Sequence, residues 1–235
     1  MFLFLKLVLA HLTADFFLQF EELYQLKVRR FLGHFLHIAI HGAVAVLLAF
    51  PYLTEPLILA YIIFLTLEHL LQDIIKYKLT RKFPAGRFIY YVTDQFFHFA
   101  VIALVLFFPA AHEARAIKSS SFLNWLYLDP AITLFPVFFI LLTFAANYTL
   151  NSFYQSYLKG SRPLHWISSP EMTVAIIERS VIALTLIVTR SPFWGLFSLA
   201  IGLIRLPFKN LRSRNDFLVS VSYTVILTFI FLRFL

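Results

Sequence analysis

Two stretches, AHLTADFFLQ at residues 10–19 and EHLLQDIIKY at residues 68–77, decide the fold. Each belongs to an apolar run and holds a histidine followed, four positions later, by an aspartate. Residues four apart lie on one face of an α-helix, about one turn from each other. Ionisable side chains are costly inside a bilayer, so those within an apolar span usually mark a functional site. The two stretches therefore predict membrane helices that turn a His and Asp pair toward a bundle interior.

Two further apolar runs, LHIAIHG at residues 36–42 and TDQFFH at residues 93–98, repeat the spacing. The chain has no cysteine, so a metal must be held by His, Asp, Glu or Asn. If the four helices bundle, eight candidate metal ligands converge: His11 and Asp15, His37 and His41, His69 and Asp73, Asp94 and His98. For one histidine alone, a hydrogen bond to a neighbouring backbone carbonyl is the simpler interpretation, but four matched pairs favour a functional polar centre.

The composition is that of an integral membrane protein. Hydrophobic residues make up 60% of the 235 residues and charged residues 14%, against about 45–50% and about 25% in soluble domains. The net charge of +8 comes from basic residues in short loops between apolar runs, so nucleic-acid binding is not expected. The first twenty residues lack a small-residue cleavage site, which predicts a retained first span rather than a signal peptide.

Eight apolar windows approach the roughly 17–25 residues that a membrane-crossing helix needs. They run from Phe2 to Phe20, His34 to Phe50, Pro56 to Tyr77, Phe88 to Phe108, Ala131 to Tyr154, Glu171 to Thr189, Pro192 to Leu206 and Phe217 to Phe234. The seventh is short, so it is either a full span or a re-entrant segment. The prediction is an all-α polytopic membrane helix bundle of about eight spans: a metal-site bundle (residues 1–108), an outer interfacial segment (109–130) and a C-terminal four-span half (131–235).

Lys and Arg concentrate in the first, third, fifth and seventh loops. The positive-inside rule places these loops in the cytoplasm and both termini outside. With these directions, one layer of His11, His41, His69 and His98 lies about one turn deeper than a second layer of Asp15, His37, Asp73 and Asp94. His34 at the membrane border points partly away from His37 and is left out, and the loop residues His112 and His165 receive no role.

The motif at His11-Leu12-x-x-Asp15 recurs as His69-Leu70-x-x-Asp73, and the pair in each following span also matches in position. Two such hairpins in one orientation predict a pseudo-two-fold axis through the first four spans. Four polar residues flank the candidate ligands and are either partners of histidine N–H groups or interhelical hydrogen-bonding residues: Gln19, Glu68, Gln72 and Gln95.

The second half of the chain carries intramembrane polar residues of another kind, namely Asn147, Asn151, Glu178 and Arg179. A structural ion pair with other helices is the first interpretation of Glu178 and Arg179. The alternative is an anion or substrate site, in which Arg179 acts with Arg205, Lys209 and Arg212.

The four ionisable motifs, in the order AHLTADFFLQ, LHIAIHG, EHLLQDIIKY and TDQFFH, resemble a bacterial multi-pass membrane family catalogued as domain of unknown function 3307. IIERSVIALTL, around Glu178 and Arg179, also fits the longer members, whereas Asp216 stands where the family pattern leads us to expect Glu. This resemblance implies no established activity. A looser similarity to membrane-bound metal-dependent hydrolases implies hydrolase chemistry by analogy only.

The residues therefore lead to an expected site with one or two divalent ions, with zinc as the first candidate and iron or manganese next. The leading hypothesis is a metal-dependent hydrolase that acts on an ester or phosphoester of a lipid or amphiphile from the cytoplasmic leaflet. A di-iron oxidase or hydroxylase and a metal or proton transporter are the alternatives.

Overall fold

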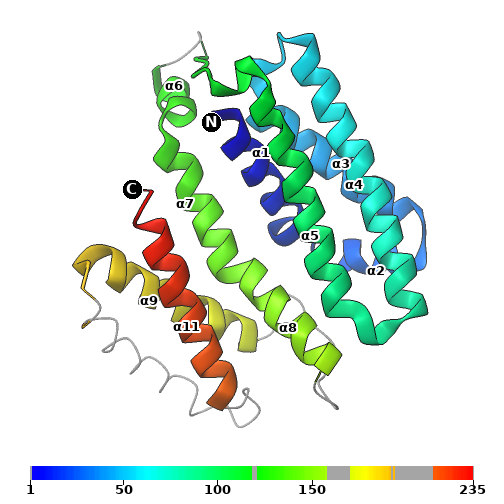
Figure 1. Cartoon of the computed structure of the whole chain (residues 1–235), viewed down its shortest axis with the longest axis vertical. Helices are drawn as coiled ribbons and strands as arrows, with labels where there is room; N and C mark the ends of the chain where they lie inside the picture. Colours follow the sequence, from blue (N-terminus) through cyan, green and yellow to red (C-terminus); the bar gives the residue numbers. More distant parts are fainter. Residues whose placement is uncertain (1, 118–120, 158–169, 192, 194–213, 235) are drawn as a thin grey trace. The chain divides into compact units, whose positions relative to one another are not determined.

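The computed structural model describes residues 2–117, 121–157, 170–191, 193 and 214–234 (Figure 1). Within these residues the regular secondary structure is helical, without a strand, as predicted. The helices pack into two compact units, residues 1–137 with 149–163 and residues 138–148 with 164–235. The predicted seventh span, Pro192–Leu206, lies outside the described residues except for Phe193, and so do Lys159, Arg162, His165, Arg205, Lys209 and Arg212.

Four helices of the first unit form a closed bundle: α1 (Phe2–Leu12), α3 (Leu32–Leu48), α4 (Pro56–Lys82) and α5 (Arg87–Ala103). Helix α1 packs against α3 and α5, and α4 packs against the same two helices (Figure 1). The first four predicted spans therefore do surround a common interior.

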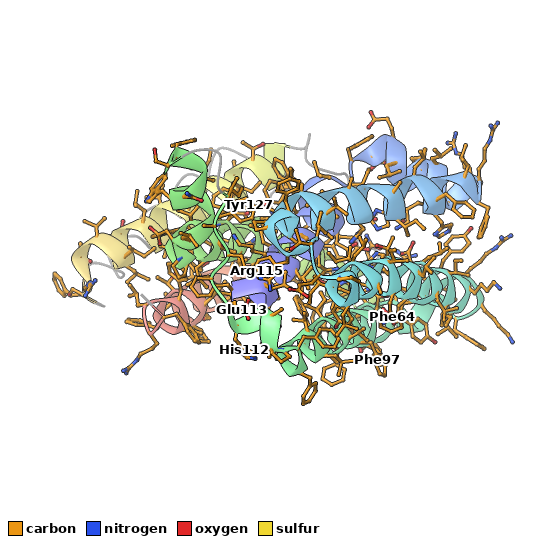
Figure 2. All side chains as sticks on the ribbon, turned by 90° about the horizontal axis from the view of Figure 1, so that it is seen from above. Phe64, Phe97, His112, Glu113, Arg115 and Tyr127 are labelled. Carbon is orange, nitrogen blue, oxygen red and sulfur yellow. The ribbon has the colours of Figure 1, made fainter. Side chains whose placement is uncertain are left out.

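The bundle carries apolar side chains outward and polar side chains inward. On α4, Phe64 and Leu67 are 48% and 59% exposed while His69 and Asp73 are buried. On α5, Phe97 is 51% exposed, and Figure 2 labels Phe64 and Phe97 on these two helices. Water would penalise such large apolar faces, whereas hydrocarbon would not. This distribution fits a protein that lies in a membrane.

Four helices within the described residues are long and apolar enough to cross a membrane: Pro56–Lys82, Pro84–Phe107, Pro130–Tyr157 and Met172–Thr189. A bent pair near the N-terminus raises the number to five if it counts as one span. Helices Leu32–Leu48 and Val219–Phe231 are apolar but shorter. The structure thus agrees with a membrane protein, and the eight predicted spans stay a prediction.

The first predicted span is not straight. Helix α1 continues into a π-helix, η1 (Thr13–Phe17), and then bends by 82° into α2 (Glu21–Arg29). Lys27 and Arg29, predicted to lie in the loop between the first two spans, belong to this short helix. Glu21 and Glu22 in the first turn of α2, and Lys27 and Arg29 in its last, complement the helix dipole and stabilise a separate short helix.

Helix α3 begins in close contact with α2. A Cβ atom on Gly33 would lie 2.2 Å from the backbone nitrogen of Lys27, which leaves no room for a side chain. Glycine at this position therefore permits the close approach that holds Lys27 against the bundle.

Four short helices follow the C-terminal ends of α3 and α5 in the first unit. They are η2 (Phe50–Tyr52), η4 (Leu104–Phe107), η5 (Pro109–His112) and α6 (Ser121–Leu128). Arg115 pairs with Glu55 and Glu113 at 2.8 and 2.9 Å, and the Tyr52 hydroxyl donates to the Glu113 carbonyl. Figure 2 labels Arg115 and Glu113. Burial raises the pKa of Tyr52, so this hydroxyl stays protonated and donates at neutral pH. Phe122 and Trp125 on α6 are 62% and 56% exposed. That these aromatic side chains lie in the outer membrane interface stays a prediction.

The helical run of α7 (Pro130–Ile140), the π-helix η6 (Leu141–Ala145) and α8 (Ala146–Tyr157) divides between the units, with its middle in the second. The second unit adds α9 (Pro170–Thr189) and α11 (Arg214–Phe231), which pack on each other. Ile182, Leu186 and Val221 form their shared apolar core. The domain boundaries predicted from the sequence follow the expected membrane spans, whereas the two units follow the packing of the helices. The predicted boundaries therefore remain predictions.

Candidate metal centre

Asp15 lies at the middle of the first unit's polar interior. It belongs to the π-helix η1, in which Leu18 N donates to Thr13 O at 2.8 Å, five residues back. Single π turns are frequent at functional sites because they re-aim side chains of an otherwise α-helical segment. The Asp15 side chain is 8% exposed, so its carboxylate depends on partners within the protein.

Four histidines surround this carboxylate. The Nε2 atoms of His41, His37 and His69 lie 3.0, 3.1 and 3.4 Å from Asp15 Oδ1. His11 Nε2 lies 3.7 Å from Oδ2, the other oxygen. These imidazoles come from three helices, α1, α3 and α4, and all of them lie next to the Asp15 carboxylate.

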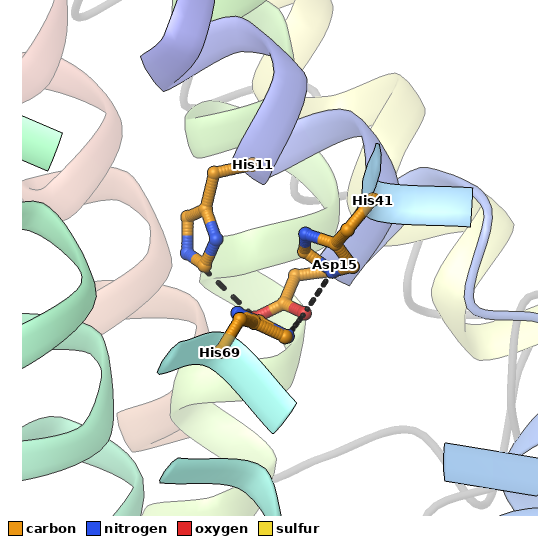
Figure 3. Close-up of side chains that lie close together, drawn as sticks. All are labelled: His11, Asp15, His41 and His69. Atoms are coloured by element: carbon orange, nitrogen blue, oxygen red, sulfur yellow. Dashed lines mark hydrogen bonds and ion pairs between the residues drawn. The ribbon is translucent and has the colours of Figure 1, made fainter. Parts of the chain in front are cut away.

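A subset of these groups is arranged like a metal site. One ligand atom from each of His11, Asp15, His41 and His69 lies within 4.8 Å of the other three, and all four residues are buried (Figure 3). This spacing is close to what one cation with ligand distances of about 2.0–2.2 Å requires. Neutral imidazoles and one carboxylate suit zinc, iron or manganese better than calcium or magnesium.

The predicted deep layer of histidines comes together. The ring of His69 lies 3.8 Å from that of His41 and 4.2 Å from that of His98, centre to centre. The ring of His11 lies 4.9 Å from that of His98. His98 is thus in contact with the cluster through its ring, while its Nε2 lies 3.4 Å from Asp94.

The predicted shallow layer divides. Asp73 and Asp94 do not join Asp15 in the four-residue group but pair with lysines. Lys27 Nζ lies 2.8 Å from Asp73, and Lys76 Nζ lies 2.7 Å from Asp94 and 3.4 Å from Asp73. Two anions and two cations therefore offset one another beside the histidine cluster.

Sequence reasoning missed three members of this network: His34, Lys27 and Lys76. His34 was left out as pointing away, yet its Nδ1 lies 2.8 Å from Asp73 Oδ2 and the residue is buried. A signal for it existed, because His34 precedes His37 by three positions on the same helix face. Lys27 was expected in a loop, and only the bend after Phe17 and the close packing at Gly33 bring it inward.

One of the four flanking polar residues contacts the candidate ligands. Gln95 Nε2 donates to Asp15 Oδ2 at 3.0 Å, and its Oε1 lies 3.3 Å from His11 Nε2. Gln19 instead accepts a hydrogen bond from Lys27 at 2.9 Å. Gln72 donates to Glu68 on the same helix.

A small cavity adjoins the cluster. Its volume of about 40 Å³ is lined by the four deep-layer histidines together with Thr66, Glu68 and apolar side chains. A water molecule needs at least about 10–15 Å³ measured in this way, so the cavity has room for one to a few waters. Glu68 thus shares a water-sized space with the imidazoles.

The candidates of the second half have contacts of their own. In the second unit Arg179 Nε donates to Ser220 Oγ at 2.8 Å, and its Nη1 donates to the carbonyls of Thr143 and Leu142 at 3.2 and 3.4 Å. These carbonyls belong to the π-helix η6, so Arg179 connects α9 to that segment. Glu178 and Asn147 are also buried, whereas Asn151 is half-buried and belongs to the first unit.

An apolar helical bundle with a buried histidine and aspartate cluster defines the class, a membrane-type helical protein with a polar centre. The chain belongs to the family described as "Protein of unknown function (DUF3307)", which matches residues 3–126. That range contains the first bundle from Leu3 onward and every residue of the centre. Neither the curated proteins nor the solved structures contain a match.

Proposed function

We propose that His11, Asp15, His41 and His69 bind one divalent cation, and that the protein is a membrane metal-dependent hydrolase. The observation that carries the proposal is the mutual approach of these four ligand atoms within 4.8 Å, in a buried site. The substrate class is an ester or phosphoester of a lipid or amphiphile, reached from the cytoplasmic leaflet. Zinc is the favoured ion, with iron or manganese next.

The pairing of Asp73 and Asp94 with lysines favours one ion over two. A dinuclear centre needs carboxylates to bridge and to offset the charge of a second cation. Both aspartates already contact ammonium groups at 2.7–2.8 Å. Asp15 is therefore the carboxylate that is available to a cation among the histidines.

The cavity beside the histidines supports hydrolysis. A bound divalent cation would act as a Lewis acid, which makes a water molecule more acidic and polarises an ester or phosphoryl oxygen. Glu68 lines the same cavity as His11, His41 and His69. Its carboxylate, oriented by the hydrogen bond from Gln72, is the group we assign to accept the proton of that water.

We also propose eight spans with both termini outside, in a bacterial inner membrane, and a pseudo-two-fold relation between the first two hairpins. The outward apolar faces of α4 and α5 support membrane insertion. The recurrence of the His-Leu-x-x-Asp motif on α1/η1 and α4 supports the internal repeat.

Elemental analysis of the purified protein tests the metal centre. Wild type expressed with added zinc, iron or manganese should retain one equivalent of one of these ions per chain. His69→Ala should lose it, because alanine supplies no imidazole, whereas His112→Ala should keep it. His112 is the matched control since it is exposed and is not one of the four candidate ligands. A wild type that stays metal-free after supplementation overturns the proposal.

The hydrolase assignment is tested separately from metal binding. Metal-loaded protein in lipid nanodiscs should release product from carboxyl-ester or phosphoester amphiphiles, and Glu68→Gln should lower that rate by about 10²–10⁴-fold while the metal stays bound. A protein that binds metal but moves metal or protons across liposomes, without turnover of any amphiphile, is a transporter and not a hydrolase.

A further inference from the structure

A second, larger cavity lies where α2 and α4 end in the first unit. Its volume is about 620 Å³, within the roughly 300–1,000 Å³ of most small-molecule sites. Two segments far apart in the sequence, residues 27–34 and 77–82, form its wall. Six of its ten lining residues are cationic and none is acidic: Lys27, Arg29, Arg30, Lys78, Arg81 and Lys82.

Most of this charge is not offset within the protein. Arg29, Arg30, Lys78, Arg81 and Lys82 are exposed, and in the described part of the chain no carboxylate forms an ion pair with them. A concave wall with charge of one sign concentrates field lines and attracts an anion.

The two cationic segments are held together by specific contacts. The Tyr77 hydroxyl donates to the Val28 carbonyl at 2.9 Å, which ties the end of α4 to the end of α2. Lys27 and His34 form a buried part of the wall, each 2.8 Å from Asp73. Cationic loops that only set membrane orientation need neither a cavity nor a buried wall.

Apolar side chains beside the cavity identify the kind of anion. Val28 and Phe31 line it and are 40% and 57% exposed, and Phe35, one turn further on α3, is 48% exposed. A soluble phosphate gains nothing from them, whereas the acyl chains of a lipid cover them. Arginine side chains provide paired N–H donors that match phosphate oxygens.

We propose that this cavity binds the phosphate headgroup of an anionic phospholipid, with Arg30 and Arg81 as its main donors. None of the four candidate metal ligands lines the cavity, so the proposal goes beyond the metal centre and does not depend on it. The lipid would sit at the basic end of the bundle with its chains along the exposed side chains of α3.

Native mass spectrometry of the detergent-purified full chain tests this site with phosphatidylglycerol, phosphatidylcholine and glycerol phosphate as probes. Phosphatidylglycerol should bind in preference to phosphatidylcholine, and glycerol phosphate in large excess should not displace it. The double variant Arg30→Gln/Arg81→Gln should bind phosphatidylglycerol about 30-fold more weakly. Both side chains are exposed, so the variant should fold, which its thermal unfolding curve checks.

The control variant Arg190→Gln/Arg233→Gln removes the same charge from exposed positions outside the cavity. It should bind phosphatidylglycerol as wild type does. Equal weakening in both variants, or equal binding of the two lipids, would reduce the effect to general charge attraction and overturn the proposal. If glycerol phosphate displaces phosphatidylglycerol, the cavity binds a soluble phosphate ester, and the proposal of a lipid ligand is overturned.

Discussion

At the scale of single residues, the three aspartates of the bundle have different partners although their sequence settings are alike. Asp15 faces imidazoles, and its ion pairs in the described part of the chain are with histidines. Asp73 and Asp94 each contact an ammonium group. The same substitution should therefore have different consequences at Asp15 and at Asp73.

Asp15→Asn removes the only anion of the four-residue group while it preserves shape. If the group binds a cation, the metal content should fall at least about tenfold, and the protein should unfold at a lower temperature. Elemental analysis and a thermal unfolding curve of the same sample measure both, with the exposed Glu22→Gln as control for the metal content. Unchanged metal with equal or higher stability would reject the site.

Asp73→Asn should leave the metal in place but destabilise the fold, because Lys27 loses the carboxylate that offsets its buried charge. Breaking a buried ion pair from one side costs about 3–5 kcal/mol. The double variant Lys27→Met/Asp73→Asn should regain part of that loss, since it removes the buried cation as well. Thermal unfolding of the three proteins gives the comparison, and a double variant no more stable than Asp73→Asn argues against the pair.

At the scale of elements, the segment from α1 to α3 decides the centre. A π-helix aims Asp15, an 82° bend turns the chain back, and α2 places Lys27 beside Asp73. After the bend, the backbones of α2 and α3 approach each other at Gly33, where they are too close for a side chain.

Gly33→Ala should therefore destabilise the protein. The new methyl group would overlap backbone atoms of Leu26 and Lys27 at 2.2–2.6 Å, and such overpacking costs typically about 1–3 kcal/mol. Gly42→Ala on the same helix meets only the Thr66 side chain at 3.5 Å, an ordinary contact. It should be neutral or stabilising by up to about 1 kcal/mol, since alanine favours a helix. Unfolding temperatures that move together in both variants would contradict this account of the bend.

At the scale of the whole molecule, helical arrangement and membrane orientation are linked. The helix Pro84–Phe107 has 24 residues and rises about 1.5 Å per residue, enough for a hydrocarbon core about 30 Å thick. Its two ends should therefore lie on opposite sides of the membrane, with the basic end in the cytoplasm.

Cysteine labelling tests this directly, because the chain has no cysteine of its own. A membrane-impermeant thiol reagent added to intact spheroplasts should label Ala114→Cys, while Lys82→Cys should react only after the membrane is opened. Both positions are exposed, so access to the reagent is the difference that is measured. If only Lys82→Cys is labelled in intact spheroplasts, the orientation is the reverse of the predicted one. If both variants are labelled, this helix does not cross the membrane.

The sequence by itself determined the helical class, the apolar helices that fit a membrane protein and the four helices that carry inward pairs of His or Asp. Apolar runs and a spacing of four are local properties, and local helical geometry converts them into faces. Only the tertiary structure decided which of the eight groups meet at one point. That Asp15 joins His11, His41 and His69 while Asp73 and Asp94 pair with lysines depends on a bend, a π turn and a close backbone approach. These features bring residues from separate helices into contact, and contacts between helices depend on packing, which the spacing within one helix does not specify.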